Sequence, residues 1–354
     1  MNMFDSSEFD KSTIPESTAE APAETKRPFS IDDLVALVRD REESIFECAH
    51  ARAIDPLTLR SQLLLHLPRL VTADRFPREH DIQQEVQAVS DFLEEIQRPY
   101  AKWLRPPERT ITLDDLEFVS LDPEIAQIYH ERLHYVGSYR PGWHYAFQEK
   151  NSGRIVCIGS VADFDLKHAQ EKIAPHIELR YVSVLSRFFT FRWAPKNIFS
   201  YFHGKLRLQL MKERDTRLMF SFINPNLGFN ASSHKGAHWT LFARESGTRY
   251  TYLDGRYRTM RFFVENYGTS DPVKLRERLG DSFIVSTIKL HPLELFAIPL
   301  QRRGRKAIPT EPHGPHIFRR PELCASIPAK SMVDRTETVL SRPPIPILPA
   351  LAAG

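Results

Sequence analysis

Residues 177–223 hold the order of elements that decides the fold, in the sequence IELRYVSVLSRFFTFRWAPKNIFSYFHGKLRLQLMKERDTRLMFSFI. The apolar, β-branched run Ile177–Thr190 predicts a long strand, which the break at Ala194-Pro195 ends. A helix is predicted over Ile198–Lys212 and a short buried strand over Leu218–Ile223. The helix is supported by four apolar residues at helical spacing: Phe199, Phe202, Leu206 and Leu210. A strand, a helix and a strand in succession predict a sheet with helices packed on it.

The residues before this stretch continue the alternation. Thr110–Leu121 is strand-like, and Asp122-Pro123 is typical of the start of a helix, which we expect to run through Arg132. A hairpin is predicted from Trp143–Gln148 to Ile155–Val161, with its turn at Asn151-Ser152-Gly153.

Four further strands are predicted after it. Trp239–Ala243 and Tyr250–Leu253 are expected to form a second hairpin. Phe283–Ile288 and Leu293–Pro299 are expected to form a strand pair that closes the domain. Residues 106–300 are therefore predicted to form an α+β (α/β) catalytic domain, with a mixed sheet flanked by helices.

Residues 29–105 are predicted to form a small helical accessory domain. Ser30 followed by Asp33 is the pattern of a capping box, and Asp55-Pro56 is typical of a helix start. A third helix is indicated by apolar residues four and three apart: Ile82, Val86, Val89, Leu93 and Ile96. The turn at 53–55 allows two interpretations, a packing module or a DNA-binding helix-turn-helix, in which only Arg60 and Gln62 would meet bases.

The two ends of the chain differ in composition from the rest. Residues 1–28 are rich in Ser, Glu, Ala and Pro, which predicts a disordered leader. Residues 301–354 contain the cluster Gln301-Arg302-Arg303-Gly304-Arg305-Lys306 and nine prolines, which predicts a flexible basic tail. Such a tail would serve nucleic acid or localisation, or would only be solvated.

Composition disfavours several classes of protein. The chain has 354 residues, of which 42% are hydrophobic and 26% charged, an ordinary globular balance. It contains no apolar run of membrane-spanning length, and its first residues are acidic, so we expect neither a membrane span nor a secretory signal but a cytoplasmic protein. The three cysteines lie far apart, which predicts neither a disulfide framework nor a zinc site.

Charge is divided unevenly along the chain. Residues 1–100 contain 11 Lys and Arg against 20 Asp and Glu, whereas the remaining residues contain 37 against 25. A basic surface attracts the phosphates of nucleic acids or of phosphorylated cofactors. The alternative is an ordinary solvated surface.

The junction Phe191-Arg192-Trp193-Ala194-Pro195-Lys196-Asn197, which precedes the predicted helix, is a candidate anion site. The free backbone N–H groups of a helix start attract anions, and Arg192 and Lys196 flank this one. The residues therefore suit a pyrophosphate, although many turns of this kind bind nothing.

Four polar residues lie at the ends of predicted elements and are candidates for proton transfer. His134 and Tyr135 follow the helix that begins at Asp122-Pro123, whereas Asn224 and His234 follow the strand Leu218–Ile223. A His or Tyr in such a position can hold a proton at a substrate amine, or can simply cap or pack. His234 and His238 are four residues apart, but Gly236 disfavours a helix there and no Glu lies between them, so no metal site is predicted.

From His134 to about Leu300 the chain resembles the Mom family of phage-type DNA modification proteins. The resemblance rests on the order and spacing of short motifs. These are His134-Tyr135, Arg187, Ser200, Phe220-Ser221-Phe222-Ile223-Asn224-Pro225, Gly228, Trp239, Asp254-Gly255-Arg256, Asn266-Tyr267-Gly268 and Leu295-Phe296-Ala297-Ile298-Pro299-Leu300. Members of this family have the acetyltransferase-like (GNAT) fold and add a carbamoylmethyl-type group to the exocyclic amine of adenine.

The chain departs from the family pattern at two positions. Asn224 stands where the family usually has Asp, and His234 stands where it usually has Tyr. Because Asn cannot act as a base, the resemblance implies either that His234 has taken over the handling of the proton or that the activity has diverged.

The resemblance implies a GNAT-like sheet that holds acetyl-CoA or another acyl-CoA between the strands Ile177–Thr190 and Leu218–Ile223. The phosphates of this donor would lie at Arg192, Lys196 and the backbone of Asn197. The reaction pocket would be lined by His134, Tyr135, Arg187, Ser200, Asn224 and His234. Tyr135 or His234 would remove a proton from the attacking amine, and Arg187 would stabilise developing negative charge.

The resemblance also implies double-stranded DNA as the partner. The adenine amine lies inside the duplex, so the base would have to leave the stack, and contacts between basic residues and phosphates would offset that cost. Two other functions stay open, because a fold alone does not fix the acceptor. One is a GNAT-fold acyltransferase that acts on a small amine or a protein, and the other is a catalytically silent DNA-binding relative.

Overall fold

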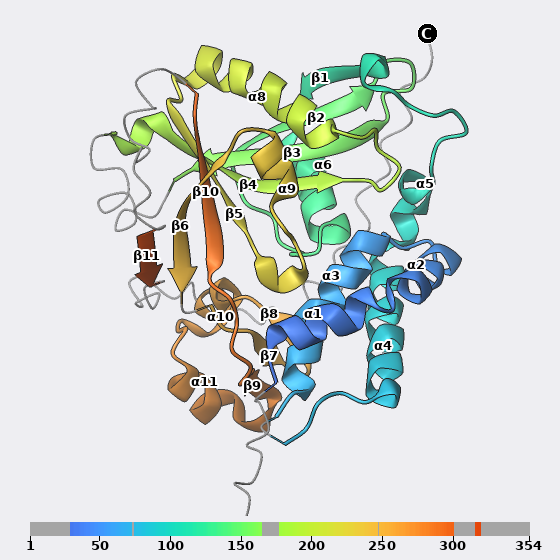
Figure 1. Ribbon diagram of the computed structural model, residues 1–354, viewed down its shortest axis with the longest axis vertical. Coiled ribbons are helices and arrows are strands. Elements are labelled where there is room, and N and C mark those ends of the chain that lie inside the picture. The colour runs from blue at the N-terminus through green and yellow to red at the C-terminus, as the bar shows by residue number, and fades with distance from the viewer. Residues whose placement is uncertain (1–28, 73, 165–176, 247, 301–315, 320–354) are drawn as a thin grey trace, which may run out of the picture.

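The computed structural model describes residues 29–72, 74–164, 177–246, 248–300 and 316–319 (Figure 1). An eight-stranded main sheet has the strand order β1-β2-β3-β4-β5-β10-β6-β11. Its strands are β1 Leu116–Ser120, β2 Trp143–Glu149, β3 Ile155–Asp163, β4 Val182–Thr190, β5 Leu218–Ile223, β6 Thr240–Ser246, β10 Leu293–Pro299 and β11 His316–Arg319. Neighbouring strands are antiparallel, except that β4 is parallel to β5 and β11 is parallel to β6.

Helices cover both faces of the main sheet. Helix α8, Ile198–Arg214, joins β4 to β5 and buries its predicted apolar side, including Phe202 and Leu206, against one face. On the other face lies α6, Pro123–Ile128, which Asp122 caps and which continues as the π-helical turn η4, Tyr129–Leu133. The mixed α+β fold class expected from the sequence is therefore confirmed.

A second sheet of three strands was not expected. It has the order β8-β7-β9, with β7 Thr251–Leu253, β8 Arg256–Arg258 and β9 Phe283–Val285, and it carries α10, Met260–Tyr267, and α11, Pro272–Leu279. Two predicted pairings are therefore wrong: β6 pairs with β10 and not with β7, and β9 pairs with β7 and not with β10. Residues 251–285 form a unit inserted between two neighbouring strands of the main sheet.

The N-terminal helices are α1 Ile31–Arg39, α2 Glu42–Ala51, α3 Pro56–His66, α4 Glu79–Gln97 and the short α5 Ala101–Leu104. The capping box at Ser30 and Asp33 and the helix start at Asp55 are confirmed. These helices share one apolar core with the three-stranded sheet, because their buried leucines pack with Tyr250 and Tyr252. In Figure 1 the helices and the three-stranded sheet lie side by side below the main sheet.

The remaining short elements connect these units. They are the helical turns η1 Leu67–Leu70, η2 Arg98–Tyr100, η3 Leu113–Asp115, η5 Leu179–Tyr181, η6 Pro225–Leu227 and η7 Gly280–Ser282, and the helix α9 Ser232–Gly236. The predicted leader at 1–28 lies outside the described residues. So does the predicted tail at 301–354, except for β11, which is a strand where a flexible tail was expected. None of the helices that the structure describes combines the length and the apolar character of a membrane span.

Candidate active site

The candidate site lies where β4 and β5 stop pairing. Their parallel pairing extends only from Val182 with Leu218 to Leu185 with Ser221. Both strands continue, β4 along β3 and β5 along β10, so their carboxyl ends form no ladder with each other. A β-bulge in β4, opposite Ser160 and Val161 of β3, falls at the same level. An interruption inside a sheet is a place where a ligand can meet backbone groups.

Arg187 follows directly after this interruption and is a half-buried cation without a carboxylate partner among the described residues. Its Nη1 donates to the backbone carbonyl of Ser186 at 2.7 Å, and its Nη2 donates to Oγ of Ser138 at 3.1 Å. Its buried Nε has no hydrogen-bond partner, and no carboxylate of the described chain forms an ion pair with it. Burial lowers the pKa of Arg187, and the charges of Arg140 and Arg261 lower it further. Such an arrangement favours an anion or a developing negative charge beside it.

Tyr135 and His134 lie near Arg187 and differ in what they can do. The rings of His134 and Tyr135 are stacked, with centroids 4.4 Å apart. His134 accepts from the backbone N–H of Val136 at 3.1 Å and also bonds the backbone of Phe188, so both ring nitrogens are used. Burial raises the pKa of the Tyr135 hydroxyl, and the charge of Arg187 opposes this. No hydrogen bond of that hydroxyl is found within the described part of the chain, so it remains available for a substrate.

Two further histidines beside Arg187 were not identified from the sequence. Nε2 of His130 and Nδ1 of His144 each lie 2.6 Å from Oγ of Ser160. All three residues are buried. Burial lowers the pKa of His130 to about 3, with a further contribution from the charge of Arg187. Both imidazoles are therefore neutral at physiological pH. We call His130, Ser160 and His144 the His–Ser–His chain.

His234 lies in a second group, on the opposite face of the main sheet. Successive strand residues point to opposite faces, and Phe188 packs on Phe199 of α8, so Arg187 points away from α8. The ring of His234 packs on Phe199 at 4.6 Å, and its Nε2 lies 3.0 Å from Oγ of Ser221. Burial lowers the pKa of His234 to about 4.

Two buried nitrogens near His234 have no partner among the described residues. They are Nε2 of His203 and Nε1 of Trp239, whose rings lie 5.0 Å apart. Buried nitrogens of this kind need a water or a ligand. This second group is therefore polar as well as aromatic, and it faces the α8 side of the point where β4 and β5 stop pairing.

Asn224 is fully engaged within the protein. Its Nδ2 donates to the hydroxyl of Tyr250 at 3.1 Å, and its Oδ1 accepts from both the backbone and the side chain of Asn226. These bonds fix the turn that follows β5. Asn224 therefore positions the backbone, and the burial of Tyr250 ties this turn to the core that the N-terminal helices share.

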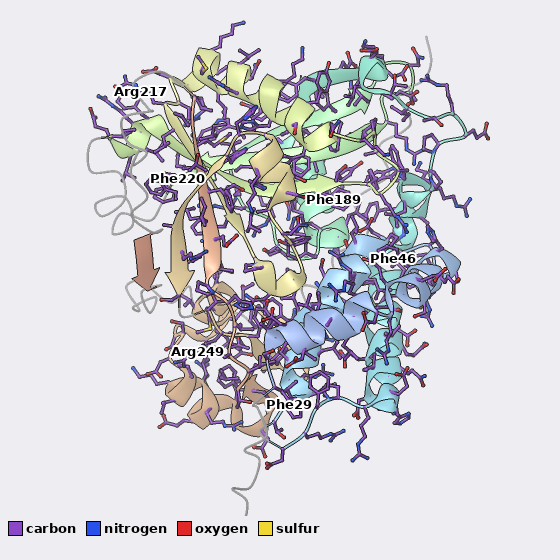
Figure 2. The ribbon with its side chains drawn as sticks, viewed as in Figure 1. Phe29, Phe46, Phe189, Arg217, Phe220 and Arg249 are labelled. Atoms are coloured by element: carbon purple, nitrogen blue, oxygen red, sulfur yellow. The ribbon has the colours of Figure 1, made fainter. Side chains whose placement is uncertain are left out.

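The start of α8 offers backbone donors. Asn197 has a left-handed backbone, with φ of 64°, and no side chain caps the helix. The N–H groups of Phe199 and Ser200 have no acceptor within the described chain, and neither has the Ser200 hydroxyl. Lys196 is exposed beside them. Arg192 is placed differently, because its guanidinium lies 4.4 Å from the centre of the Phe46 ring. Figure 2 shows Phe46 on the N-terminal helices.

The predicted site residues thus fall into groups at one interruption of the sheet. His134, Tyr135 and Arg187 lie together on the face of η4. Ser200, His234, Lys196 and Asn197 belong to the α8 side, Asn224 lies in the turn after β5, and Arg192 faces the N-terminal helices. Within the described residues no cluster of three or more His, Cys, Asp or Glu side chains could hold a metal ion.

Comparison with known proteins finds likeness only among solved structures. No protein-family model matches the chain, and no curated protein matches it. The ribosomal-protein-S5-alanine acetyltransferase from Vibrio fischeri is 7% identical, with a TM-score of 0.32, over 55% of this chain and 98% of that one.

Two further structures are similar over the same share of the chain. The GNAT superfamily phosphinothricin acetyltransferase from Sinorhizobium meliloti, solved in complex with AcCoA, is 12% identical, with a TM-score of 0.32, over 56% of this chain and 95% of that one. The spermidine N-acetyltransferase from Vibrio cholerae is 5% identical, with a TM-score of 0.29, over 54% and 96%.

Proposed function

We propose that the protein is a GNAT-like N-acyltransferase whose reaction takes place where β4 and β5 stop pairing. The observation that carries this proposal is Arg187, a half-buried cation beside the interruption, whose buried Nε has no partner and which no carboxylate of the described chain neutralises. An unneutralised charge away from water lowers the stability of the fold. The presence of Arg187 is therefore best explained by a ligand or a transition state that carries negative charge.

An acyl-CoA donor fits the residues on the α8 side. The free N–H groups at Phe199 and Ser200, with Lys196 beside them, suit a pyrophosphate at the start of a helix of 17 residues. The buried nitrogens of His203 and Trp239 offer further donors along the same face. Because Arg192 stacks on Phe46, we assign it a smaller part in holding the donor than the helix start. When bound, acyl-CoA would supply a thioester carbonyl as the electrophile.

The chain's own residues would then act as follows. Arg187 stabilises the negative charge that develops on the carbonyl oxygen when an amine attacks it. Because burial raises its pKa, the Tyr135 hydroxyl, which lies close to Arg187, keeps its proton and would give it to the leaving group. His134 orients the Tyr135 ring by stacking on it, and Asn224 fixes the turn after β5. His234, a neutral imidazole because burial lowers its pKa, is a candidate acceptor for the proton of the amine, reached from the α8 side.

For the acceptor we propose the exocyclic amine of adenine in DNA. This rests on the family resemblance and on charge, because Arg140 and Arg261 add to the positive potential at Arg187. Residues 101–300 contain 28 Lys and Arg against 21 Asp and Glu, which favours contact with phosphates. The helix-turn-helix alternative is not favoured, because Arg60 pairs with Glu42 and Gln62 donates to the Tyr135 carbonyl. A small amine or a protein amine is the competing acceptor.

Mass spectrometry of nucleosides tests the acceptor. The purified protein is incubated with acetyl-CoA and duplex DNA, and in parallel with spermidine as a small amine. We expect a new deoxyadenosine mass that is absent with Arg187→Ala and present with Arg180→Ala, a control in η5 just before β4 whose guanidinium pairs with exposed Glu178. Acetylation of spermidine with unmodified DNA would favour the small-amine acceptor. Salt-sensitive DNA binding without any turnover would favour the silent relative.

Calorimetric binding of acetyl-CoA tests the donor site separately. Lys196→Glu should weaken binding about fivefold, the effect of roughly 1 kcal/mol at a helix start. Lys212→Glu, in the last turn of the same helix, is the matched control and should leave binding unchanged. Equal loss in both variants would show that the start of α8 does not hold the donor.

A further inference from the structure

The His–Ser–His chain continues to the protein surface through Tyr139. The Tyr139 hydroxyl lies 3.0 Å from Nε2 of His144, so four polar groups follow one another at hydrogen-bond distance. Tyr139 is partly exposed, whereas the other three residues are buried. At the inner end, Nδ1 of His130 is fully buried and has no partner among the described residues.

We propose that Tyr139 and the His–Ser–His chain form a proton wire between the surroundings of Arg187 and solvent. The inference rests on the proposed function and deepens it: the attacking amine loses a proton beside Arg187, and this proton needs a path to solvent, while the leaving group takes a different proton from the Tyr135 hydroxyl, which solvent then replaces. Neither the sequence motifs nor the family resemblance includes these four residues.

The wire transfers a proton without leaving a net charge behind. In its ready state the Nδ1 lone pair of His130 is free, Nε2–H of His130 donates to Ser160, the Ser160 hydroxyl donates to Nδ1 of His144, and Nε2–H of His144 donates to Tyr139. When a proton bonds to Nδ1 of His130, the proton on Nε2 of the same ring moves to the Ser160 oxygen. The Ser160 proton moves to Nδ1 of His144, the Nε2 proton of His144 moves to the Tyr139 oxygen, and the Tyr139 proton leaves to water.

The electrostatic field along the wire favours this outward direction. Arg187 lies at the inner end, where its positive charge lowers the pKa of His130. The carboxylates of Asp122 and Glu131 act at the outer end, where their negative charge raises the pKa of the Tyr139 hydroxyl together with burial. A stable imidazolium at His130 is disfavoured by both burial and Arg187, so the transfer runs through neutral rings in a concerted manner.

The main sheet holds the wire together. His144 of β2 is directly opposite Ser160 of β3 in the register, so their side chains point to the same face. His130 reaches the same serine from the π-helical turn η4, where the extra residue in the turn shifts the direction of the side chain. The geometry therefore depends on strand register and on one irregular helical turn.

Histidine tautomers test the wire without any substrate. In a continuous wire the Ser160 hydroxyl accepts from one ring and donates to the other, so the wire requires His130 and His144 to carry the same neutral tautomer, both Nδ1–H or both Nε2–H. Long-range nitrogen NMR of ¹⁵N-histidine-labelled full-length protein reports the tautomers, with His130→Gln and His144→Gln for assignment among 14 histidines. Matching neutral tautomers at pH 7.5 support the wire. Opposite tautomers, or an imidazolium at either position, would overturn it.

Turnover supplies the second arm of the test. Ser160→Ala should lower the rate of acetyl transfer about 100-fold and abolish a multi-proton solvent isotope effect, and Tyr139→Phe should lower the rate about tenfold. Ser183→Ala is the matched control, since Ser183 is a buried serine of β4 whose hydroxyl bonds Thr216 and no other side chain among the described residues. Matching tautomers without any acyl transfer would reject the proposed function and retain the wire. Acyl transfer that is unchanged in Ser160→Ala would reject the wire and retain the function.

Discussion

Replacing Arg187 with methionine should stabilise the protein while it removes activity. A fully buried ion without a counter-ion costs several kcal/mol of folding free energy, and a half-buried one such as Arg187 costs less. Its two hydrogen bonds, to Ser186 and Ser138, return about 1.5–3 kcal/mol each. A methionine of similar length loses those bonds but adds about 2 kcal/mol from burial of its apolar side chain. The cost of the ion and the contribution of its two bonds roughly cancel, so we expect the apolar burial in Arg187→Met to raise the free energy of unfolding by up to about 2 kcal/mol.

Arg69 provides the matched comparison, with the opposite sign. Its Nη2 lies 2.6 Å from the carboxylate of the buried Glu85. Arg69→Met removes the neutralising charge and should lower the free energy of unfolding by about 3 kcal/mol. Urea unfolding followed by tryptophan fluorescence measures both variants. If Arg187→Met is destabilised as much as Arg69→Met, Arg187 is a structural residue and its use as a sign of function is refuted.

Three further substitutions test the fold. Asp55 is buried at the start of α3, and this burial raises its pKa to about 6. Asp55→Asn should keep the cap and stabilise the protein by about 2 kcal/mol at pH 8. Thermal unfolding should show that this advantage disappears as the pH falls below about 4. Burial lowers the pKa of His203 to about 4, so the unfolded chain binds the proton first and the free energy of unfolding falls between about pH 6.5 and pH 4. In His203→Phe this loss should shrink by about 3 kcal/mol in urea titrations. An unchanged dependence of stability on pH would contradict the lowered pKa of His203. Gly159 faces the Phe202 ring, which a Cβ at this position would overlap. Gly159→Ala should therefore lower the free energy of unfolding by about 1–3 kcal/mol in the same urea assay. Gly153→Ala, which has open space around it but a positive φ, should lower it by less.

The sequence predicted the elements that depend on local periodicity. Helix α8 and strands β2, β3 and β5 were found near their expected bounds, because apolar spacing and turn residues are local signals. The two wrong pairings involve β6 and β10, which are adjacent in the sheet but separated by an inserted unit of two helices and three strands. A strand sequence indicates which face is buried but does not identify a distant partner.

The candidate site was predictable only in part, for the same reason. Arg187, His134 and Tyr135 lie together, as the family resemblance implies, but His234 packs on the α8 face. The His–Ser–His chain was missed although a signal existed. The predicted hairpin turns at Asn151-Ser152-Gly153, and counting outward from Ser152 already places His144 opposite Ser160. His130, the third member of the chain, could not be predicted, since its position depends on the π-helical turn η4.

The N-terminal helices also hold the loop that carries His134 and Tyr135. The Thr58 hydroxyl donates to the carbonyl of Leu133, and the Gln62 amide donates to the carbonyl of Tyr135. Both donors come from α3, so any event that displaces this helix pulls on the backbone on either side of His134. A molecule bound to the outer surface of these helices would therefore shift the backbone that carries His134 and Tyr135, and through it the surroundings of Arg187, without touching either.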